Sequence, residues 1–576
     1  MLQKALVWTL AAVTTAGSLC YGQNDRAARV RAIRNSVAEG KASFDQLPLG
    51  LQKALPASAR LAHFASVMDR FVAAASNSTV DEPTEGGGFK DDNPFSVRVN
   101  DPRRDLAFSP FAGYTQSTTS TARCGEQVVV GFNDSGSILS TLFSGKGGVS
   151  FSGVAVSDDD GESFRDLGAV PPGPDPSSFL LGEPSVACSD PDTFYFVQTF
   201  TNTDVLGFLS EGLALSKSAD GGNTWSDPVH VAGPLSGSDA IDDGRIAVDP
   251  SDHRKIYVSY RHLSFGGGAS CSALQSTIEV VASVDGGQTF GAPIVIDQQC
   301  FATSFLLHVG SRIAVSSKGT VFVASQLYTL FPGLFAQTVQ VNSMSSNGVV
   351  SPAVTVANIV QGGADITEAA FGFGVGSLTE YTVQGGFRNL RGFDLAVDRS
   401  GTKTDGAVYV VWDDGRDKSI PEFESEETGI DGTYEFSDIF FSRSLDGGQT
   451  FSAAAKLNSD FQPVNGRGFD HYQPSAAVDH TGTVAVCWYD RRNDPQNFQF
   501  ERFCAESTNT GNTWAEFRVR GSQSVPSRGQ DLLLPRDEMG QYDGVTADFL
   551  GHSHGFLDAF QWMSSGMNPD VRIHKF

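Results

Sequence analysis

Arginines, carboxylates and tyrosines recur at one place in this sequence, at the start of short apolar segments. The members of this set are Glu183, Asp243, Arg245, Arg312, Asp394, Tyr472, Tyr542 and Asp543. Further charged residues, Arg491 among them, follow the second apolar segment of a pair at 261–262, 413–417 and 489–494. Because Arg binds carboxylates through two parallel hydrogen bonds, the set predicts a site for an acidic sugar or a polyanionic glycan. The alternative is structural, since Asp and Arg in such positions often tie neighbouring loops together.

The apolar segments themselves come in repeated pairs, separated by a small polar turn. One instance pairs 245–250 with 256–259, and another pairs 474–479 with 484–488. We count seven such units, the first of which (118–124 with 128–132) is degenerate. With a third and a fourth strand in each unit, every unit predicts one four-stranded antiparallel blade.

An octapeptide of the form Ser-x-Asp-x-Gly-x-Thr-aromatic lies between the expected third and fourth strands of most units. It occurs at 218–225, 283–290 and 444–451, more loosely at 157–164, and at 507–514 with Asn509 in the Asp position. Asp and Ser side chains can bond nearby backbone N–H groups, and Gly supplies unusual backbone angles, so the octapeptide predicts a tight turn. The residues expected to shape these turns are Ser157, Asp159, Gly161, Ser218, Asp220, Gly222, Ser283, Asp285, Gly287, Ser444, Asp446 and Gly448.

The octapeptide resembles the Asp-box of the sialidase-like, or BNR-repeat, β-propellers. The resemblance covers about residues 110–576 and implies an all-β chain with one propeller. Seven blades are favoured and six, the number in sialidases, is the alternative. The seventh unit lacks a clear fourth strand, and residues 95–100 are expected to supply it and close the ring.

Blade topology separates the two rims of this expected propeller. The octapeptide turns and the turns between first and second strands share one rim, so the starts of the first strands share the other. Inner strands converge there, and a pocket is expected on that rim.

The resemblance also implies roles at that rim. Tyr542 lies roughly where sialidases keep the nucleophilic Tyr, and Arg245 and Arg312 are placed to hold a substrate carboxylate. Asp394 and Asp243 are the further catalytic candidates, and Arg491 and Glu183 the further substrate-binding ones. The Arg-Ile-Pro motif of many sialidases reads Arg-Ile-Ala at both arginines.

The N-terminal part differs from the rest. Lys4 and an apolar run to Leu19 predict a signal peptide at 1–22 and hence a secreted or periplasmic protein. Residues 23–90 form an expected helical segment with a Gly-rich linker, and 91–576 form the propeller.

Six of the seven cysteines remain after residue 22. Antiparallel pairing places Cys271 opposite Cys300 and Cys487 opposite Cys504, while Cys124 and Cys188 occupy matching places in adjacent units. Three disulfides are expected, but the pairing geometry requires a close approach only of the first two pairs, and free buried thiols are the alternative. None of the cysteines has metal-site spacing, so no metal is expected.

Two classes of function remain. One is an exported, exo-acting sialidase-like glycoside hydrolase, and the other is a non-catalytic propeller that binds glycans or proteins. The net charge of −25 argues against nucleic acid or an anionic membrane as a partner. We expect a carbohydrate or glycoprotein partner, no cofactor, no transmembrane segment in the mature chain, and a monomer.

Overall fold

The computed structural model describes residues 96–576 with short gaps and with longer gaps at 204–208, 265–270, 330–336, 366–380, 461–467, 526–539 and 563–568. The expected signal peptide (1–22) and helical segment (23–90) lie outside the described residues. Within the described part, none of the helices combines the length and the apolar character that a membrane span requires.

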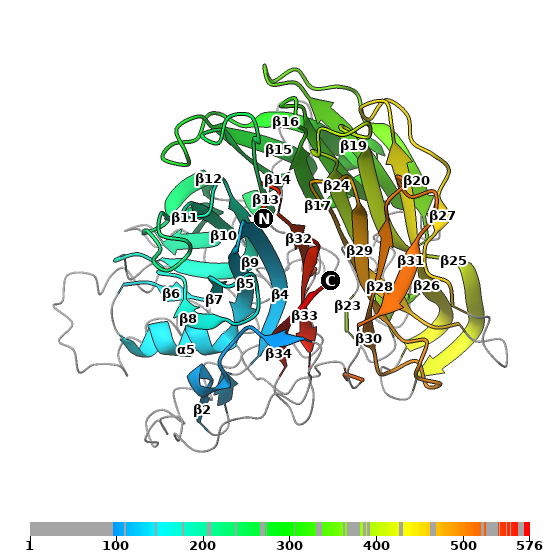
Figure 1. Cartoon of the computed structure of the whole chain (residues 1–576), viewed down its shortest axis with the longest axis horizontal. Coiled ribbons are helices and arrows are strands. Elements are labelled where there is room, and N and C mark those ends of the chain that lie inside the picture. Colours follow the sequence, from blue (N-terminus) through cyan, green and yellow to red (C-terminus); the bar gives the residue numbers. More distant parts are fainter. Residues whose placement is uncertain are drawn as a thin grey trace.

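The described strands form seven antiparallel blades, whose strands follow one another from the axis outward (Figure 1). Blades 1 and 2 contain β4 (Gln116–Cys124), β5 (Gln127–Asp134), β7 (Ser152–Ser157) and β8 (Arg165–Ala169), then β9 (Phe179–Cys188), β10 (Phe194–Thr203), β11 (Leu209–Ser218) and β12 (Val229–Ser236). Blades 3 and 4 contain β13 (Asp239–Val248), β14 (Ile256–Ser264), β15 (Gln275–Ser283) and β16 (Ile294–Cys300), then β17 (Leu306–Val315), β18 (Val321–Thr329), β19 (Gln337–Met344) and β20 (Val354–Ile359). Blades 5 and 6 contain β24 (Phe393–Val397), β25 (Val408–Ser425), β26 (Ile430–Ser444) and β27 (Ala455–Lys456), then β28 (His471–Val478), β29 (Val484–Asp490), β30 (Glu501–Ser507) and β31 (Ala515–Arg518). Blade 7 contains β32 (Gly544–Ala547), β33 (Phe556–Trp562), β34 (Asp570–Lys575) and β1 (Val97–Arg98).

A few elements lie outside this plan. A short strand, β6 (Val149–Ser150), pairs in parallel with β9, and blade 5 is extended by β21 (Gly363–Asp365), β22 (Tyr381–Val383) and β23 (Phe387–Arg388). The remaining elements are η1 (Pro102–Arg104), β2 (Leu106–Phe108), β3 (Phe111–Gly113), α5 (Ser135–Ser144) and α6 (Phe301–Ser304). The side chain of Asp134 accepts hydrogen bonds from the N–H groups of Gly136 and Ser137 and so caps α5.

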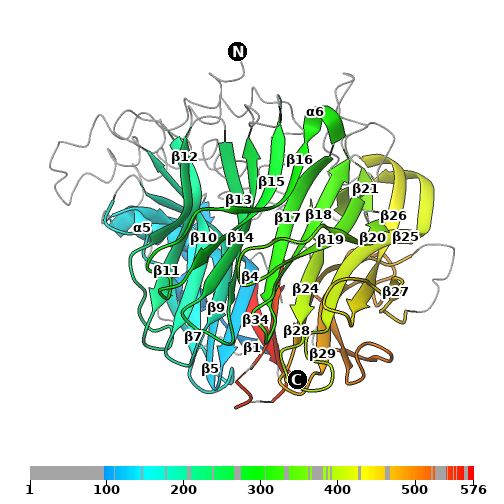
Figure 2. The ribbon, with the colours of Figure 1, turned by 90° about the horizontal axis from the view of Figure 1, so that it is seen from above.

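The inner strands form a closed ring. Each of β4, β9, β13, β17, β24, β28 and β32 contacts the next, and β32 contacts β4. Figure 1 shows the last blade, in red, beside the first, in blue, and Figure 2 shows β13, β17 and β24 following one another across the molecule. The ring closes inside blade 7, where Val97 pairs with Ile573 and Arg98 with Arg572. The expected closing strand is confirmed, and the number of blades is seven.

The core of the molecule lies between the blades. Seven larger apolar clusters occur among the described residues, and each combines side chains of two neighbouring blades. The second strand of a blade contributes to the clusters on both sides, which explains its nearly continuous apolar sequence, for example Val408 to Trp412. β-branched and aromatic residues suit such strands because they pack well on a pleated surface.

The octapeptide turns have one shared geometry. In blade 2, Ser218 Oγ donates to Asp220 Oδ1 (2.8 Å) and accepts from Gly222 N (2.8 Å), while Asp220 accepts from Thr224 N (2.8 Å) and Thr224 Oγ1 (2.7 Å). Gly222 has φ +87°, and a Cβ there would lie 2.5 Å from a methyl group of Val129 in blade 1. The turn is therefore a structural contact between neighbouring blades.

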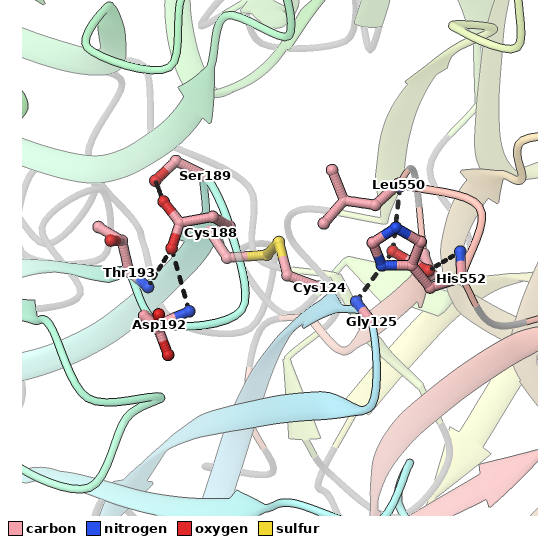
Figure 3. The surroundings of a disulfide bond; sticks show 10 residues. Cys124, Gly125, Cys188, Ser189, Asp192, Thr193, Leu550 and His552 are labelled. Atoms are coloured by element: carbon pink, nitrogen blue, oxygen red, sulfur yellow. Dashed lines mark hydrogen bonds between the residues drawn. A yellow bond between two sulfur atoms is a disulfide. The ribbon is translucent and has the colours of Figure 1, made fainter.

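The cysteines form the three expected pairs. Cys271–Cys300 and Cys487–Cys504 join strands or loops within blades 3 and 6, with Cα–Cα distances of 5.6 and 4.0 Å. Cys124–Cys188 joins the inner strands β4 and β9 of blades 1 and 2, with a Cα–Cα distance of 6.3 Å. Figure 3 shows this third bridge close to Leu550 and His552, which belong to blade 7.

The Asp220→Ala variant tests the role of the octapeptide turns. Loss of the side-chain bonds to Ser218 and Thr224 is expected to lower the free energy of unfolding by about 1 kcal/mol. Asp220→Asn should lose less, because Asn509 makes the corresponding bonds in blade 6, with its Oδ1 accepting from Thr513 N. Urea unfolding measures the difference, and Asp227→Ala, at an exposed neighbouring position, is the control. Equal stability of the Asp220→Ala and control variants would contradict this role.

The Arg572→Met variant tests the closure of the ring. Arg572 is buried, and its Nε and Nη2 donate to the hydroxyl (2.7 Å) and the carbonyl (2.6 Å) of Ser96. The variant is expected to lose about 2 kcal/mol of unfolding free energy, the usual contribution of hydrogen bonds to a charged group. Arg254→Met, at a side chain that is 77% exposed, should unfold like the wild type. A wild-type midpoint for Arg572→Met would show that these bonds do not hold β1.

Candidate functional site

Several inner strands are distorted at the same level, near the rim opposite to the octapeptide turns. The backbone is left-handed at Thr118 (φ 53°), Glu183 (φ 59°), Asp243 (φ 59°) and Gln473 (φ 52°). At each of these residues the register against the second strand of the blade shifts, as in a β-bulge. Bulges redirect side chains and concentrate at the rims of such sheets and next to functional sites. The distorted level is therefore the place where the predicted site residues are expected to meet.

Arg245, Asp243 and Tyr542 lie together at this level. The Arg245 guanidinium carbon is 3.4 Å from the centroid of the Tyr542 ring, which places the cation on the face of the ring. Its Nε and Nη2 donate to Asp243 Oδ1 over 3.0 and 2.6 Å. Three predicted site residues from blades 3 and 7 are thus in direct contact.

Arg312 and Asp394 extend this group into blades 4 and 5. Arg312 Nη1 lies 3.4 Å from Asp243 Oδ2, so one carboxylate contacts both arginines. Arg312 Nε is 3.7 Å from Asp394 Oδ1. Burial and, next, the positive charge of Arg245 lower the pKa of Arg312 to about 10. We call these five residues, Asp243, Arg245, Arg312, Asp394 and Tyr542, the axial site.

Asp394 is the carboxyl of the axial site best suited to hold a proton. Burial raises its pKa in spite of the neighbouring Arg312. Its side chain is still 22% exposed, whereas that of Asp243 is fully buried. A carboxyl group with a raised pKa and access to solvent can act as a general acid.

Tyr542 is held as a neutral phenol. Its hydroxyl donates to the carbonyl of Pro184 over 3.0 Å. Burial raises its pKa above the usual value, and the positive charge of Arg245 opposes this effect only in part. The negative charges of Glu183 and Asp243 also act to raise it.

The carboxylates of this level also connect the blades. Glu183 Oε2 in blade 2 accepts from Asp243 N in blade 3 (3.4 Å), and Asp243 Oδ2 accepts from Ser311 N in blade 4 (2.8 Å). Asp394 Oδ2 in blade 5 accepts from Ala476 N in blade 6 (2.9 Å). Each of these bonds links one inner strand to the next. Glu183, Asp243 and Asp394 therefore tie neighbouring blades together, which is the structural role that the sequence left as the alternative to ligand binding.

Arg491 lies in the loop after the second strand of blade 6. Its Nη1 donates to the carbonyl of Asn497 (2.9 Å) and lies 3.4 Å from Asp470 Oδ2, and its guanidinium carbon is 5.2 Å from the centroid of the Tyr472 ring. These contacts are all within blade 6. The structure therefore places Arg491 in the framework of that blade and not against the two arginines of the axial site.

A second buried ionic cluster joins blades 6 and 7 and was not predicted from the sequence. Arg502 binds both oxygens of Asp558 over 2.8 and 2.7 Å, and its Nη1 is 3.6 Å from Asp543 Oδ2. Asp543 was recognised as a rim residue, but Arg502 and Asp558 lie inside strands without any neighbouring motif that marks them. Asp543 also accepts from Thr119 Oγ1 of blade 1 (3.1 Å), so the cluster reaches across the closure of the ring.

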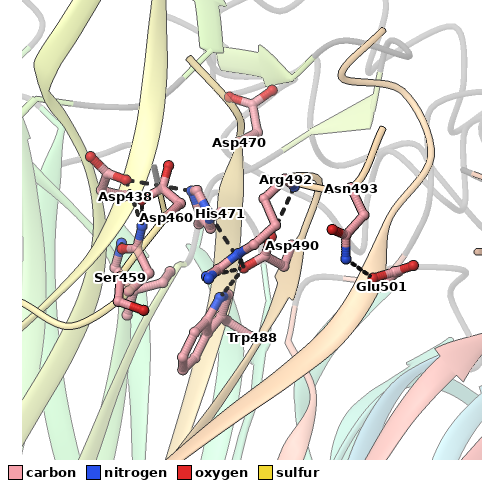
Figure 4. A network of polar contacts seen from close by, with 12 residues as sticks. Asp438, Ser459, Asp460, Asp470, His471, Trp488, Asp490, Arg492, Asn493 and Glu501 are labelled. Carbon is pink, nitrogen blue, oxygen red and sulfur yellow. Dashed lines mark hydrogen bonds and ion pairs between the residues drawn. The ribbon is translucent and has the colours of Figure 1, made fainter. Parts of the chain in front are cut away.

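Two groups of described residues have the spacing of metal ligands, but Cys487 and Cys504 of the first are joined in a disulfide. The second group is Asp438, Asp460 and His471 (Figure 4). Lys456 Nζ already lies 2.7 Å from Asp438 and 3.2 Å from Asp460. Asn458 Nδ2 donates to both carboxylates, over 2.7 and 2.8 Å. The ammonium group of Lys456 thus occupies the place that a cation would take, and we assign this group to the structure of blades 5 and 6.

The seven-bladed ring, with octapeptide turns between third and fourth strands, has the fold of a sialidase-like β-propeller. No protein-family model matches the chain, and no curated protein matches it. Among solved structures, it is similar to an alpha-L-arabinanase of Penicillium chrysogenum, with 11% identity, a TM-score of 0.41, and 84% of this chain and 97% of that chain covered.

Two further solved structures are similar at the same distant level. An alpha-L-arabinofuranosidase of Fusarium graminearum shares 8% identity at a TM-score of 0.37, over 84% of this chain and 98% of that one. A sialidase of Trypanosoma rangeli shares 9% at a TM-score of 0.34, over 84% and 57%. Likenesses this distant carry no information on activity or substrate.

The pH dependence of stability tests the environment of Asp543. Burial raises its pKa to about 6, while an unfolded Asp titrates near 3.9. Between these values the folded state holds a proton that the unfolded state has lost. This contribution to stability is complete below about pH 4 and disappears as the pH rises through about 6.

The expected result is that Asp543→Asn becomes more stable relative to the wild type as the pH rises from about 4 to about 7, by about 3 kcal/mol. Urea unfolding at a series of pH values measures this difference. Asp227→Asn, at an exposed position, should follow the wild type throughout. A constant difference between Asp543→Asn and the wild type would mean that Asp543 titrates normally.

Proposed function

We propose that the protein is an exported, exo-acting glycoside hydrolase that takes an acidic sugar at the axial site, in the manner of a sialidase. The observation that carries this proposal is the convergence of two arginines, a tyrosine and a protonable carboxyl from four different blades. Such a set provides the functions that hydrolysis of an acidic glycoside needs: anion binding, proton donation and a nucleophile.

Arg245 and Arg312 are the proposed binding groups for the carboxylate of the substrate. A guanidinium group presents its five N–H donors in a fixed planar arrangement that matches a carboxylate. Asp243 fixes both cations from one side, which orients them before a ligand arrives. Orientation in advance lowers the free-energy cost of binding.

Asp394 is the proposed proton donor to the leaving oxygen of the glycoside. Its raised pKa keeps a larger fraction of the carboxyl protonated near neutral pH than an ordinary Asp would show. Tyr542 is the proposed nucleophile, as the resemblance implies. For that role its hydroxyl has to leave the carbonyl of Pro184 and pass its proton to a carboxylate, for which Glu183 and Asp243 are the nearby candidates.

A non-catalytic propeller that binds glycans or proteins is the second candidate. It is favoured by the bonds that the axial groups already make. The Tyr542 hydroxyl is bonded to Pro184, and Asp243 is bonded to both Arg245 and the backbone of Ser311. Residues with such complete internal bonding also fit a purely structural role at the axis.

Export is supported by the three disulfides, since such bonds persist in oxidising compartments. The acidic composition, with a net charge of −25, is compatible with a soluble monomer that acts on glycans or glycoproteins and not on nucleic acid.

A release assay on aryl glycosides, sialosides included, tests the two candidates. For the hydrolase we expect turnover by the wild type and a fall in kcat of at least about 100-fold in Asp394→Asn, which removes the proton donor. Tyr542→Phe should abolish turnover while the unfolding midpoint stays near that of the wild type. Asp227→Asn is the matched surface control and should keep full activity.

Each outcome favours one candidate. Full turnover by Tyr542→Phe would exclude this residue as the nucleophile. Absence of turnover on the whole panel, together with binding of an immobilised glycan by the wild type, would favour the non-catalytic propeller.

A further inference from the structure

The phenyl ring of Phe393 lies against one of the two arginines of the axial site. The guanidinium carbon of Arg312 is 4.8 Å from the centroid of this ring, which is within the range of a cation–π contact. Phe393 is the first residue of β24 and directly precedes Asp394 in the chain. It is only 1% exposed and belongs to the apolar cluster between blades 4 and 5. A member of this apolar cluster is therefore in direct contact with a charged group of the axial site.

The ring of Tyr542 contacts the same guanidinium group. Its centroid lies 5.4 Å from the guanidinium carbon of Arg312 and 3.4 Å from that of Arg245. Both arginines of the axial site therefore lie over aromatic rings. Of the two rings that contact Arg312, that of Phe393 is the nearer.

Arg312 is a buried cation beside a second cation. It is 6% exposed, and burial together with the positive charge of Arg245 lowers its pKa to about 10. A cation in this position is stabilised by each negative potential around it. The face of an aromatic ring supplies such a potential, and the contribution of the contact is larger when the cation is removed from water.

A ring and a carboxylate stabilise an arginine in different ways. The ring carries no net charge, so it lowers the free energy of the cation without neutralising it. A carboxylate in the place of the ring would neutralise the cation, and the anionic group of a ligand would then meet an ion pair. A Leu side chain would fill the space of the ring but would supply no negative potential. The aromatic ring is therefore suited to hold Arg312 in place and to keep its positive charge available.

We propose that Phe393 is a positioning residue of the axial site, whose ring holds Arg312 where this arginine meets the carboxylate of an acidic sugar. The proposal rests on the proposed function in taking the axial site to bind such a sugar. Because Phe393 is almost completely buried, its ring acts through Arg312 and not through contact with the ligand. The preference of the site for a charged sugar over a neutral one then depends on this ring.

Isothermal titration calorimetry of the whole protein with N-acetylneuraminate and with glucuronate tests the proposal. Both sugars carry a carboxylate, and the methyl ester of each is the neutral comparison. Phe393→Leu, which keeps an apolar side chain but removes the ring, is expected to bind the acids about tenfold more weakly than the wild type. Its affinity for the esters should stay the same, so the preference for acid over ester falls by the same factor.

Three further variants separate the effect of the ring from an effect on stability. Phe393→Tyr keeps the ring and should keep the wild-type preference. Phe393→Met fills the space with a flexible side chain and tests the same loss if the Leu variant does not fold. Phe322→Leu makes the same change at another buried member of the same cluster, in blade 4, and should also keep the wild-type preference. Circular dichroism and urea unfolding show whether each variant is folded.

The outcomes distinguish this inference from the proposed function. Binding of an acid by the wild type without turnover, together with weaker binding by Phe393→Leu, supports the inference and excludes the hydrolase. Wild-type preference in both Phe393→Leu and Phe393→Met overturns the inference and leaves the proposed function standing. An equal loss in Phe322→Leu, or an equal loss for acids and esters, also overturns it, because the ring would then act only through the stability of the blades. If the wild type binds neither acid, both are overturned.

Discussion

The apolar contact between neighbouring blades is the interaction on which the rest of this structure depends. A four-stranded sheet of this size has two faces to cover, and each blade covers both by packing against its two neighbours. Because every blade needs two neighbours, an open row would leave two apolar faces in water. Closure through β1 and β34 removes both exposed faces at once.

The charged residues around the axis are compatible with this apolar construction because the same ring supplies their partners. Carboxylates at the distorted level accept hydrogen bonds from backbone N–H groups of the next blade, as Asp243 does from Ser311. The positive charges are matched within the same group, as Arg502 is by Asp558. Burial without such partners would be strongly unfavourable. The position of the axial groups is therefore fixed by the geometry of the ring as a whole.

The repeat unit made much of the fold predictable from the sequence. Apolar pairs such as 245–250 with 256–259 mark the two inner strands, and the octapeptide marks the turn between the outer two. These patterns favoured seven blades over six, and they predicted the closing strand and the cysteine pairs. The same topology placed Tyr542, Arg245 and Arg312 at one rim, where the structure brings them into contact.

The unpredicted features depend on irregular backbone or on partners far away in the chain. A period of two residues describes a regular strand, but the bulge at Glu183 interrupts that period without changing the composition. The sequence signals available for these bulges were Pro184 and Pro474, which follow the left-handed residues Glu183 and Gln473. The ion pair of Arg502 and Asp558 joins residues 56 positions apart in different blades, and neither residue carries a local motif. Arg491 lies in the loop after β29, and no local motif marks the conformation of that loop. Its contacts with Asn497 and Asp470 could therefore not be predicted from the sequence.

The closing strand has a consequence for biosynthesis. The Ser96 hydroxyl and its partner Arg572 are 476 residues apart, so this contact cannot form until residue 572 has been synthesised. Until then, blades 1 and 6 present to their surroundings the apolar faces that later pack against blade 7. Contacts between such distant residues also slow folding, because the entropy of loop closure is lost before the contact stabilises the chain. If the chain is exported during synthesis, the ring closes only after the chain has crossed the membrane. The late closing contact would then leave the chain able to cross in an unfolded state.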